Sequence, residues 1–471
     1  MIGRIEEQRL LHELAQGGES EFVVIYGRRR VGKTFLIRET FENKFFFSYT
    51  GIANVSARQQ RGEFTKALRE HGWVPEGGGA GVPENWFGAF DALRALITKA
   101  NTEERLLIFI DEMPWMDNSK SDFVPAFEHF WNGWASGRKH IMLIACGSAT
   151  SWITKKIFRN KGGLYNRTTR QIALKPFTLA ECGEYHASMG VAMNTQDMIE
   201  SYMIFGGIPY YLRLMEKRYS LALNVDRICF GETAPLRHEF DRLMDTLFTR
   251  PAKYIQVLEA LHAIKKGLTR EAIANLIDFG NGGNLSRILL ELEEYGFIRR
   301  YKPFGKGKNG ALYYLSDPFV AFHLTFIRNT GSENFWSSYA DNAGHRAWSG
   351  YAFEQVCLSH INEIKKALGI SGVLSDVSSW ISRGDGKGAQ IDLVIDRADR
   401  VVNLCEIKFA KGPFEIDRAY DRALREKIEI FRSETKTRKA LHLTMITTYG
   451  VKPGKYAGLI QAEINMDELI N

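Results

Sequence analysis

One eight-residue segment near the start of the chain constrains its fold more than any other feature. Residues 27–34 read GRRRVGKT, follow the continuous apolar run FVVIY and open the helical stretch TFLIRETF. The pattern GxxxxGK[ST] between a strand and a helix is typical of a phosphate-binding loop. The glycines let backbone N–H groups turn toward phosphate oxygens, and the start of the helix adds favourable partial charge. A chance glycine–lysine turn is the alternative, which the flanking strand and helix disfavour.

The residue types in this loop predict a nucleoside triphosphate site. Lys33 would reach the β- and γ-phosphates, and the Thr34 hydroxyl would bind Mg²⁺. We therefore expect ATP and Mg²⁺ as cofactors. The other residues expected to surround the nucleotide are Gly27, Arg28, Arg29, Arg30, Val31 and Gly32.

The segment LLIFIDE supplies the acidic element that such a site needs. Its apolar part has the length of a buried strand, and Asp111 and Glu112 stand at the end of that strand. Asp111 would hold the Mg²⁺ through water, while Glu112 would orient and deprotonate the attacking water. An Asp-Glu pair at a strand end is also a common helix N-cap, so this assignment depends on the phosphate-binding loop.

Several further residues are candidates for contacts with the nucleotide. The strand IMLIAC ends next to Ser148, where a polar side chain would sense the γ-phosphate. Arg167, or else Arg170, would act as an arginine finger from within the chain or from a neighbour, although surface ion pairing is the commoner fate of an arginine. The turn GGIP would close over the nucleotide at Pro209, but turn chemistry alone explains these residue types equally well.

The order of strands and helices predicts an α/β fold for residues 1–249. FVVIY, LLIFI and IMLIAC are continuous apolar runs of strand length, and residues 45–49 are expected as a further strand. Strands that are buried on both faces have this composition. We therefore expect the parallel sheet of a P-loop NTPase, with helices on both faces and a helical lid.

These motifs, taken in order, resemble those of the archaeal-type ATPases of the AAA+/STAND group. The resemblance rests on IGR with Glu6 near the N-terminus, GRRRVGKT, LLIFIDE, the strand end CGS, NRTTRQIAL and GGIPYYL. It implies a nucleotide-dependent switch or motor. It also implies that Ile2 and Gly3 lie near the adenine and that Ser148 is a sensor.

Residues 250–320 change in character and predict a winged-helix domain. YIQVLEALHAI, LTREAIANLI and NLSRILLELEEYGFI have apolar residues three and four apart, with Thr269 and Asn284 at the N-cap positions. The strand-like segments FIRRY and ALYYL follow, joined by the loop PFGKGKNG. Residues 250–310 hold 11 Lys and Arg against 6 Asp and Glu, which favours contact with a polyanion such as DNA.

The expected DNA contacts lie on the third helix and on the wing. Such residues contact phosphates and confer affinity more than sequence preference. A winged helix also serves as a lid on the nucleotide domain in STAND-type ATPases, and this remains the alternative. The residues concerned are Asn284, Ser286, Arg287, Arg299, Arg300, Lys302, Lys306 and Lys308.

A helical linker is expected over residues 321–349, followed by an α/β module over 350–471 that carries four charged residues in a suggestive pattern. Glu354 lies in a helical stretch, Asp392 in the strand QIDLVI, and Glu406 and Lys408 in the strand VVNLCEIKF. Residues i and i+2 of a strand share a face, so Glu406 and Lys408 point the same way. Asp392 and Glu406 would converge on one hard cation, with Glu354 completing the set. Lys408 would hold or help to deprotonate the water that attacks a phosphodiester.

This spacing resembles the PD-(D/E)xK nuclease superfamily, which has the restriction-endonuclease-like fold. The sequence departs from that pattern because Gln390 and Ile391, rather than a proline, precede Asp392. Lys427, in a later helix, is expected as a further basic contact. The alternatives are a module that binds without cutting and a chance strand pattern, but charges on apolar strands are costly unless they meet a metal or each other.

The whole sequence therefore predicts an ATP- and Mg²⁺-dependent DNA-processing enzyme. A nucleotide-controlled switch that binds DNA or protein without cleavage is the alternative. Apolar runs stop at strand length, which argues against a membrane helix. The five cysteines form no CxxC pair, and the charged N-terminus has no signal-peptide core, so a cytoplasmic protein without zinc or disulfides is expected, and its oligomeric state stays open.

Overall fold

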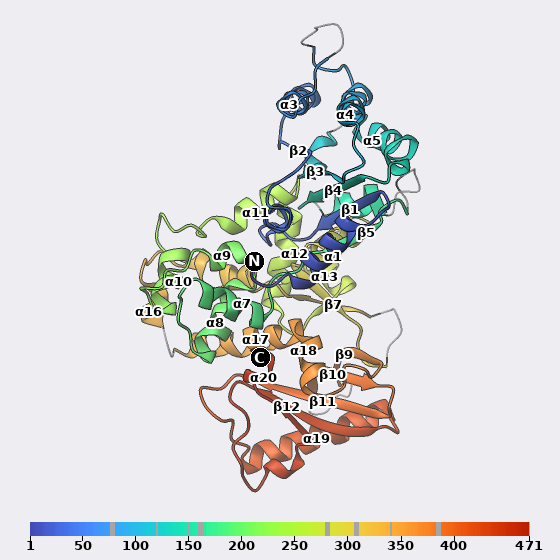
Figure 1. The fold of residues 1–471 in the computed structure, drawn as a ribbon. Helices are drawn as coiled ribbons and strands as arrows, with labels where there is room; N and C mark the ends of the chain where they lie inside the picture. Colours follow the sequence, from blue (N-terminus) through green and yellow to red (C-terminus); the bar gives the residue numbers. More distant parts are fainter. Residues whose placement is uncertain are drawn as a thin grey trace. The chain divides into compact units, whose positions relative to one another are not determined.

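The structure is a computed structural model, and it forms two compact units. It describes residues 1–75, 81–118, 121–148, 150–158, 164, 166–277, 283–305, 310–339, 342–382 and 388–470. The first unit is Met1–Pro176 and the second is Phe177–Asn471 (Figure 1). The domain boundaries expected after residues 249, 320 and 349 all fall inside the second unit and stay predictions.

A parallel sheet in the order β2-β3-β4-β1-β5 forms the centre of the first unit. All adjacent pairs are parallel, as the continuous apolar runs predicted. The strand expected at residues 45–49 begins two residues later. The strands are β1 (Glu21–Tyr26), β2 (Phe47–Thr50), β3 (Leu106–Asp111), β4 (Ile141–Gly147) and β5 (Arg170–Ala173).

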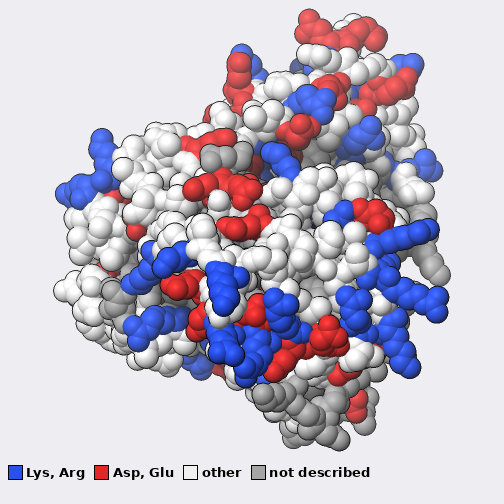
Figure 2. Space-filling model, turned by 90° about the horizontal axis from the view of Figure 1, so that it is seen from below, with Lys and Arg blue, Asp and Glu red and all other residues white. Residues whose placement is uncertain are grey.

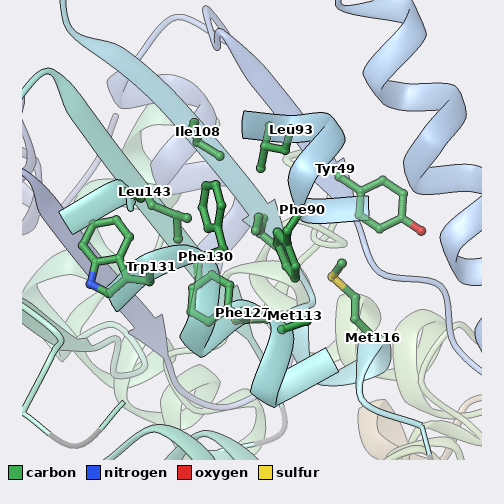
Figure 3. Close-up of a cluster of buried hydrophobic side chains, with 14 of the residues drawn as sticks. Tyr49, Phe90, Leu93, Ile108, Met113, Met116, Phe127, Phe130, Trp131 and Leu143 are labelled. Carbon is green, nitrogen blue, oxygen red and sulfur yellow. The ribbon is translucent and has the colours of Figure 1, made fainter. Parts of the chain in front are cut away.

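The helices of the first unit cover this sheet. They are α1 (Ile5–Gln16), α2 (Lys33–Thr40), α3 (Ala57–Glu70), α4 (Trp86–Ala100), α5 (Phe123–Gly133) and α6 (Thr150–Ile153). On one face, aromatic side chains of α4 and α5 pack against alternate strand residues such as Ile108 and Leu143 (Figure 3). Each fully buried Phe or Leu contributes roughly 2 kcal/mol, so this core holds the strand ends firmly in place.

Helices at the start of the second unit pack with helices that come much later in the chain. The Leu179 N–H donates to His360 Nε2 at 2.9 Å, which joins α7 to the junction between α17 and α18. None of the described helices has both the length and the apolar composition of a membrane span. The helices are α7 (Leu179–Ser188), α8 (Thr195–Phe205), α9 (Pro209–Leu212), α10 (Leu221–Cys229), α11 (Glu239–Leu247), α15 (Pro318–Thr325), α16 (Phe335–Tyr339), α17 (Ala343–Ser359), α18 (Ile361–Ala367) and α20 (Asp467–Ile470).

The described residues between 252 and 315 form three helices and a small antiparallel sheet. The Thr269 hydroxyl caps its helix by accepting from the Ala272 N–H at 3.1 Å, as expected. Asn284 is not an N-cap: it is the first residue of its helix, and its side chain accepts from Arg287 at 2.8 Å within the first turn. The winged-helix identity stays a prediction. The elements are α12 (Ala252–Ala263), β6 (Leu268–Thr269), α13 (Arg270–Leu276), α14 (Asn284–Glu294), β7 (Ile298–Tyr301) and β8 (Leu312–Leu315), with the sheet ordered β6-β8-β7.

A mixed sheet ordered β13-β12-β11-β10-β9 ends the chain. β9, β10 and β11 pair antiparallel, while β11, β12 and β13 pair parallel. The register of β10 against β9 shifts between Ile391 and Val394, which is a β-bulge that contains Asp392. The elements are β9 (Ser375–Ile381), β10 (Gln390–Arg397), β11 (Val401–Lys408), α19 (Arg418–Thr435), β12 (Ala440–Thr447) and β13 (Ala462–Ile464).

Hydrogen bonds join the small sheet to the final sheet within the second unit. The Phe304 N–H donates to the Ser379 carbonyl at 3.0 Å, and the Tyr314 hydroxyl lies 3.4 Å from Ser379 Oγ. Ser379 is in β9, opposite the bulge that contains Asp392. The segment after β7 is therefore fixed to the sheet that carries the acidic residues.

Candidate functional site

The loop between β1 and α2 takes a backbone path that needs glycine. Gly27 and Gly32 have φ of +147° and +90°, and Arg30 has φ of +71°. A Cβ atom on Gly27 would lie 2.3 Å from the carbonyl oxygen of Leu174, so a larger residue cannot fit without moving the backbone. The expected strand–loop–helix geometry is therefore present, and it places Lys33 at the first position of α2.

Lys33 is buried, with 5% of its surface exposed, and its ammonium group points back into the loop. Nζ donates to the carbonyl oxygens of Gly27 and Arg28, both at 3.0 Å, and to Ser148 Oγ at 3.2 Å. Burial lowers the pKa of Lys33, although neighbouring acidic groups oppose that shift. Within the described part of the chain, all of these acceptors are neutral, so the positive charge has no ion-pair partner.

Asp111, at the end of β3, lies next to the hydroxyl that would help to hold a metal. Thr34 Oγ1 is 3.1 and 3.0 Å from the two carboxylate oxygens of Asp111. The Cys146 thiol donates to Asp111 Oδ1 at 2.6 Å, and burial raises the pKa of Cys146 well above its usual value. A hydroxyl and a carboxylate side by side are the oxygen ligands that Mg²⁺ takes in such sites, so these residues fit that ion.

Glu112 has a strained backbone and a fixed side chain. Its φ of +46° is in the left-handed region, which a residue with a Cβ adopts only at a cost of about 1–3 kcal/mol. The Ser148 N–H donates to Glu112 Oε2 at 3.2 Å, and the Ser148 hydroxyl donates to Oε1 at 2.7 Å. Ser148 therefore links the Lys33 ammonium to the Glu112 carboxylate.

Sequence reasoning did not single out Arg4, which follows the expected residues Ile2 and Gly3. The buried Arg4 guanidinium donates to the Val31 carbonyl at 3.5 Å and to the Lys175 carbonyl at 2.6 Å. It therefore joins the N-terminal segment to the phosphate-binding loop. The motif IGR contained this signal, but the sequence alone does not say which of its residues turns inward.

Other residues predicted for this site lie outside the group formed by Lys33, Thr34, Asp111, Glu112 and Ser148. Arg167 and Arg170 are both exposed, and Arg170 donates to the neighbouring Thr169 carbonyl at 3.0 Å. Pro209 is the first residue of α9 in the second unit. Their roles toward a nucleotide stay predictions.

A second group of charged residues is centred on Glu406 in β11. Lys408 Nζ lies 2.9 Å from Glu406 Oε1, and Lys427 Nζ lies 2.7 Å from Oε2. The Tyr420 hydroxyl donates to Oε1 at 2.8 Å. Burial would raise the pKa of Glu406, but the two lysines outweigh burial, so its pKa is lowered.

Glu354 and Asp392 lie close enough to Glu406 and Lys408 to interact with them electrostatically. Burial, followed by the Asp392 carboxylate, raises the pKa of Glu354 to about 8. Burial and the Glu406 carboxylate raise the pKa of Asp392, whose Oδ1 accepts from Gln390 at 3.1 Å. We call Glu354, Asp392, Glu406, Lys408 and Lys427 the acid–lysine cluster.

The acid–lysine cluster has suitable ligands for a hard cation but holds them in a closed arrangement. Three carboxylates are suitable ligand types for Mg²⁺. Among the described residues, however, no group of three or more His, Cys, Asp or Glu side chains is arranged to hold a metal ion. Lysine ammonium groups lie against both oxygens of Glu406, so the residue types fit the cation and the present side-chain positions do not.

Sequence reasoning missed Tyr420 and Gln390 and gave Lys427 only a general basic role. Tyr420 and Lys427 are seven residues apart on α19, which is close to two helical turns, so both point toward Glu406. That spacing was available in the sequence. What it lacked was any indication that α19 would pack over β11.

The residues expected to contact DNA are only partly available. Asn284, Ser286, Arg287 and Lys302 are exposed. Several of the expected contacts already have partners. Arg287 donates to Asn284, Arg300 pairs with Glu293 at 3.6 Å, and Arg299 donates to the Tyr301 hydroxyl at 3.0 Å. Lys306 and Lys308 lie outside the described residues. Figure 2 shows Lys and Arg in several groups on one face of the molecule, with Asp and Glu among them.

Comparison with known proteins finds similar sequences for the part of the chain that contains the first site. Residues 2–215 match the model of a family described as an ATPase domain predominantly from Archaea. An uncharacterized protein of Methanocaldococcus jannaschii is 27% identical over 417 residues, or 87% of this chain and 87% of that protein. An uncharacterized ATP-binding protein of the same organism is 42% identical over 43 residues, or 9% of this chain and 73% of that protein.

Similar solved structures have low sequence identity to this chain. A Walker-type ATPase of Pyrococcus abyssi has a TM-score of 0.48 and 16% identity, covering 69% of this chain and 96% of that one. The ORC2 protein of Aeropyrum pernix, in its ADPNP–ADP complexes, has a TM-score of 0.42 and 15% identity, covering 70% and 94%. Residues 2–215 are thus similar to an ATPase domain that is found predominantly in Archaea.

Proposed function

We propose that this chain binds ATP together with Mg²⁺ at the loop between β1 and α2 and hydrolyses it there. The observation that carries the proposal is the buried Lys33 ammonium, whose three hydrogen-bond acceptors are all neutral. A buried ammonium group with only neutral hydrogen-bond partners is costly, and a phosphate anion would supply a charged partner. The similarity of residues 2–215 to an archaeal-type ATPase domain supports the same activity.

Each residue of the site would then have a separate task. Lys33 would exchange its carbonyl contacts for phosphate oxygens, and the loop N–H groups would bind the same anion. Thr34 and Asp111 would hold Mg²⁺, which supplies positive charge that stabilises the phosphates in the transition state. Glu112 would orient the attacking water and accept its proton, and Ser148 would fix the position of that carboxylate.

Binding of a fluorescent ATP analogue and release of phosphate test this proposal. In the Lys33→Ala variant we expect loss of both analogue binding and turnover, with an unchanged circular dichroism spectrum. Lys44→Ala is the control, because Lys44 is an exposed lysine that pairs only with the exposed Glu42 in the described structure. Normal turnover by the Lys33→Ala variant would exclude this site.

For the second unit we propose that the acid–lysine cluster acts on DNA, with cleavage that depends on Mg²⁺. The supporting observation is that Asp392, Glu406 and Lys408 interact electrostatically, together with Glu354. In this proposal the carboxylates would hold Mg²⁺, which would supply an activated water, and Lys408 would position that water. The alternative, a DNA- or protein-binding switch without cleavage, gains support from the closed arrangement around Glu406.

A plasmid-nicking assay with Mg²⁺ and ATP separates these two functions. Cleavage that is lost in Asp392→Ala and Lys408→Ala, while ATP turnover persists, would support the nuclease. Intact plasmid together with a gel shift that weakens steeply as salt rises would support a DNA-binding switch, because phosphate contacts are strongly salt-dependent. If the plasmid stays intact and no gel shift is seen, a function in binding protein partners is the remaining possibility.

A further inference from the structure

Lys427 lies where a cation would have to bind if Glu406 were a metal ligand. Its Nζ is 2.7 Å from Glu406 Oε2 and donates a hydrogen bond to that oxygen. The other oxygen, Oε1, already has two partners, the Lys408 ammonium at 2.9 Å and the Tyr420 hydroxyl at 2.8 Å. An incoming divalent ion would therefore meet a positive charge at either oxygen of Glu406.

The two lysines are held in different ways. Lys408 is on the same strand as Glu406, two residues away, so the strand itself fixes their proximity. Lys427 comes from α19, and its contact depends on the packing of that helix over the strand. Its side chain is 30% exposed, whereas that of Glu406 is 4% exposed. The Lys408 side chain is similarly exposed, at 34%, so the difference is that Lys427 can swing away on its flexible stem without moving the strand that carries the carboxylate.

The charge balance of the acid–lysine cluster depends on Lys427. Because the raised pKa of Glu354 keeps that group mostly protonated at neutral pH, two carboxylates, Asp392 and Glu406, face two ammonium groups, and both carboxylates interact electrostatically with Lys427. Without the Lys427 charge, a single lysine would face these two carboxylates, and the cluster would carry the excess negative charge that attracts a divalent cation. With the Lys427 charge in place, the same carboxylates are largely neutralised from within the chain.

We infer that Lys427 is the resident counter-ion of Glu406 and competes with a divalent cation for that carboxylate. Cation binding at the acid–lysine cluster then requires Lys427 to withdraw toward solvent. The inference rests on the metal role proposed above for this cluster, and it assigns Lys427 a specific part in that role. It explains why the residue types suit a cation while no three-ligand set is present among the described residues.

Mn²⁺ binding to the full-length chain without nucleotide tests this inference, with free Mn²⁺ measured by electron paramagnetic resonance. Lys427→Met removes the charge and keeps the length of the side chain, and we expect it to bind Mn²⁺ at least about tenfold more tightly than the wild type, which is 1.4 kcal/mol. Lys427→Arg keeps the charge and should resemble the wild type. The added affinity should vanish in the double variant Lys427→Met, Asp392→Asn.

Lys439→Met is the matched control. Lys439 Nζ lies 2.5 Å from Asp396 Oδ1, and its side chain is 33% exposed, so it is a lysine of similar exposure that pairs with a carboxylate of the same sheet, although Asp396 is 29% exposed. This control should leave Mn²⁺ affinity unchanged. Thermal unfolding of every variant would confirm that all of them are folded.

Three results would overturn the inference, and they have different meanings. Equal or weaker Mn²⁺ binding by folded Lys427→Met would remove the competition while leaving the metal site in place. Tighter binding that persists in the double variant with Asp392→Asn would place the ion elsewhere. Absence of Mn²⁺ binding by both the wild type and Lys427→Met would reject the proposed metal role of the cluster itself.

Discussion

The two charged sites of this chain satisfy their buried charges in opposite ways. In the first unit, the buried Lys33 ammonium contacts two carbonyl oxygens and one hydroxyl, all of them neutral. In the second unit, the buried Glu406 carboxylate contacts two ammonium groups and a phenol hydroxyl. The first site therefore has a positive charge that a ligand anion can neutralise, and the second has already neutralised its own charge.

The positions of these residues in their sheets explain the difference. Asp111 and Ser148 lie at or just beyond strand ends, and Lys33 opens α2 after the loop that follows β1, so loop carbonyl and N–H groups are available as partners. Glu406 lies within β11, where the backbone groups are used by the neighbouring strands. A charge in that position must be satisfied by other side chains. A charge near a loop can be stabilised by backbone groups until a ligand binds, whereas a charge within a strand needs a permanent side-chain partner.

The largest effect that would sharpen this comparison is expected from Glu112→Gln. If the first site is built for a ligand, this change should lower ATP turnover by about 10²–10⁴-fold, because the amide cannot accept the proton of the attacking water. Binding of the ATP analogue should persist, because the contacts of Lys33 and the loop are unchanged. Phosphate release and analogue fluorescence, measured on the same samples, check both statements.

Glu70→Gln is the control for the turnover measurement. Glu70 is the last residue of α3 and is exposed, so the same chemical change there should leave turnover at the wild-type level. Full activity in Glu112→Gln would mean that another group accepts the proton. The comparison of the two sites would then rest on how their buried charges are paired, and not on a catalytic role of Glu112.

Stability measurements compare the two sites more directly. Glu406→Gln leaves two lysines without their carboxylate, and we expect a loss of about 2–3 kcal/mol, somewhat below the usual 3–5 because both lysines are partly exposed. Lys33→Met removes a buried charge whose hydrogen-bond partners in the described structure are all neutral, so its cost should stay within about 1 kcal/mol of the wild type. Urea unfolding of each variant tests this order, and a larger loss in Lys33→Met would break the comparison.

Much of the first site could be predicted from sequence because each of its residues lies in a short motif that can be recognised by itself. GRRRVGKT sets the loop, and the apolar runs before Asp111 and Ser148 set the neighbouring strands. The parallel order of β1, β3 and β4 then brings these strand ends together. Arg4 escaped notice because its partners, Val31 and Lys175, are distant in sequence.

The second site was harder to predict because its geometry depends on packing. The i, i+2 rule correctly placed Lys408 beside Glu406. The bulge at Asp392 shifts the register of β10 against β9, and no turn or glycine signal in QIDLVI indicates it. The approach of Lys427 depends on how α19 docks on the sheet, which the helical pattern of α19 alone does not specify. The sequence alone therefore could not predict which carboxylates would bind a cation.

The smallest expected effect concerns the uncharged partner of Glu406. Tyr420→Phe removes a hydroxyl that donates to the buried carboxylate at 2.8 Å and changes little else. A hydrogen bond to a charged group is worth about 1.5–3 kcal/mol, but the two lysines remain, so we expect a loss of about 1 kcal/mol. Tyr456→Phe is the control, because Tyr456 is also half-buried and packs against the apolar cluster beside α19.

The double variant Tyr420→Phe, Glu406→Gln measures how strongly the hydroxyl and the carboxylate are coupled. If Tyr420 acts through the charge of Glu406, the two losses should not add, because the neutral amide needs the phenol hydroxyl less than the carboxylate does. Urea unfolding of the four proteins gives this coupling. Additive losses would mean that Tyr420 stabilises α19 by packing alone, and the Glu406 charge would then be balanced by the two lysines without help from a neutral donor.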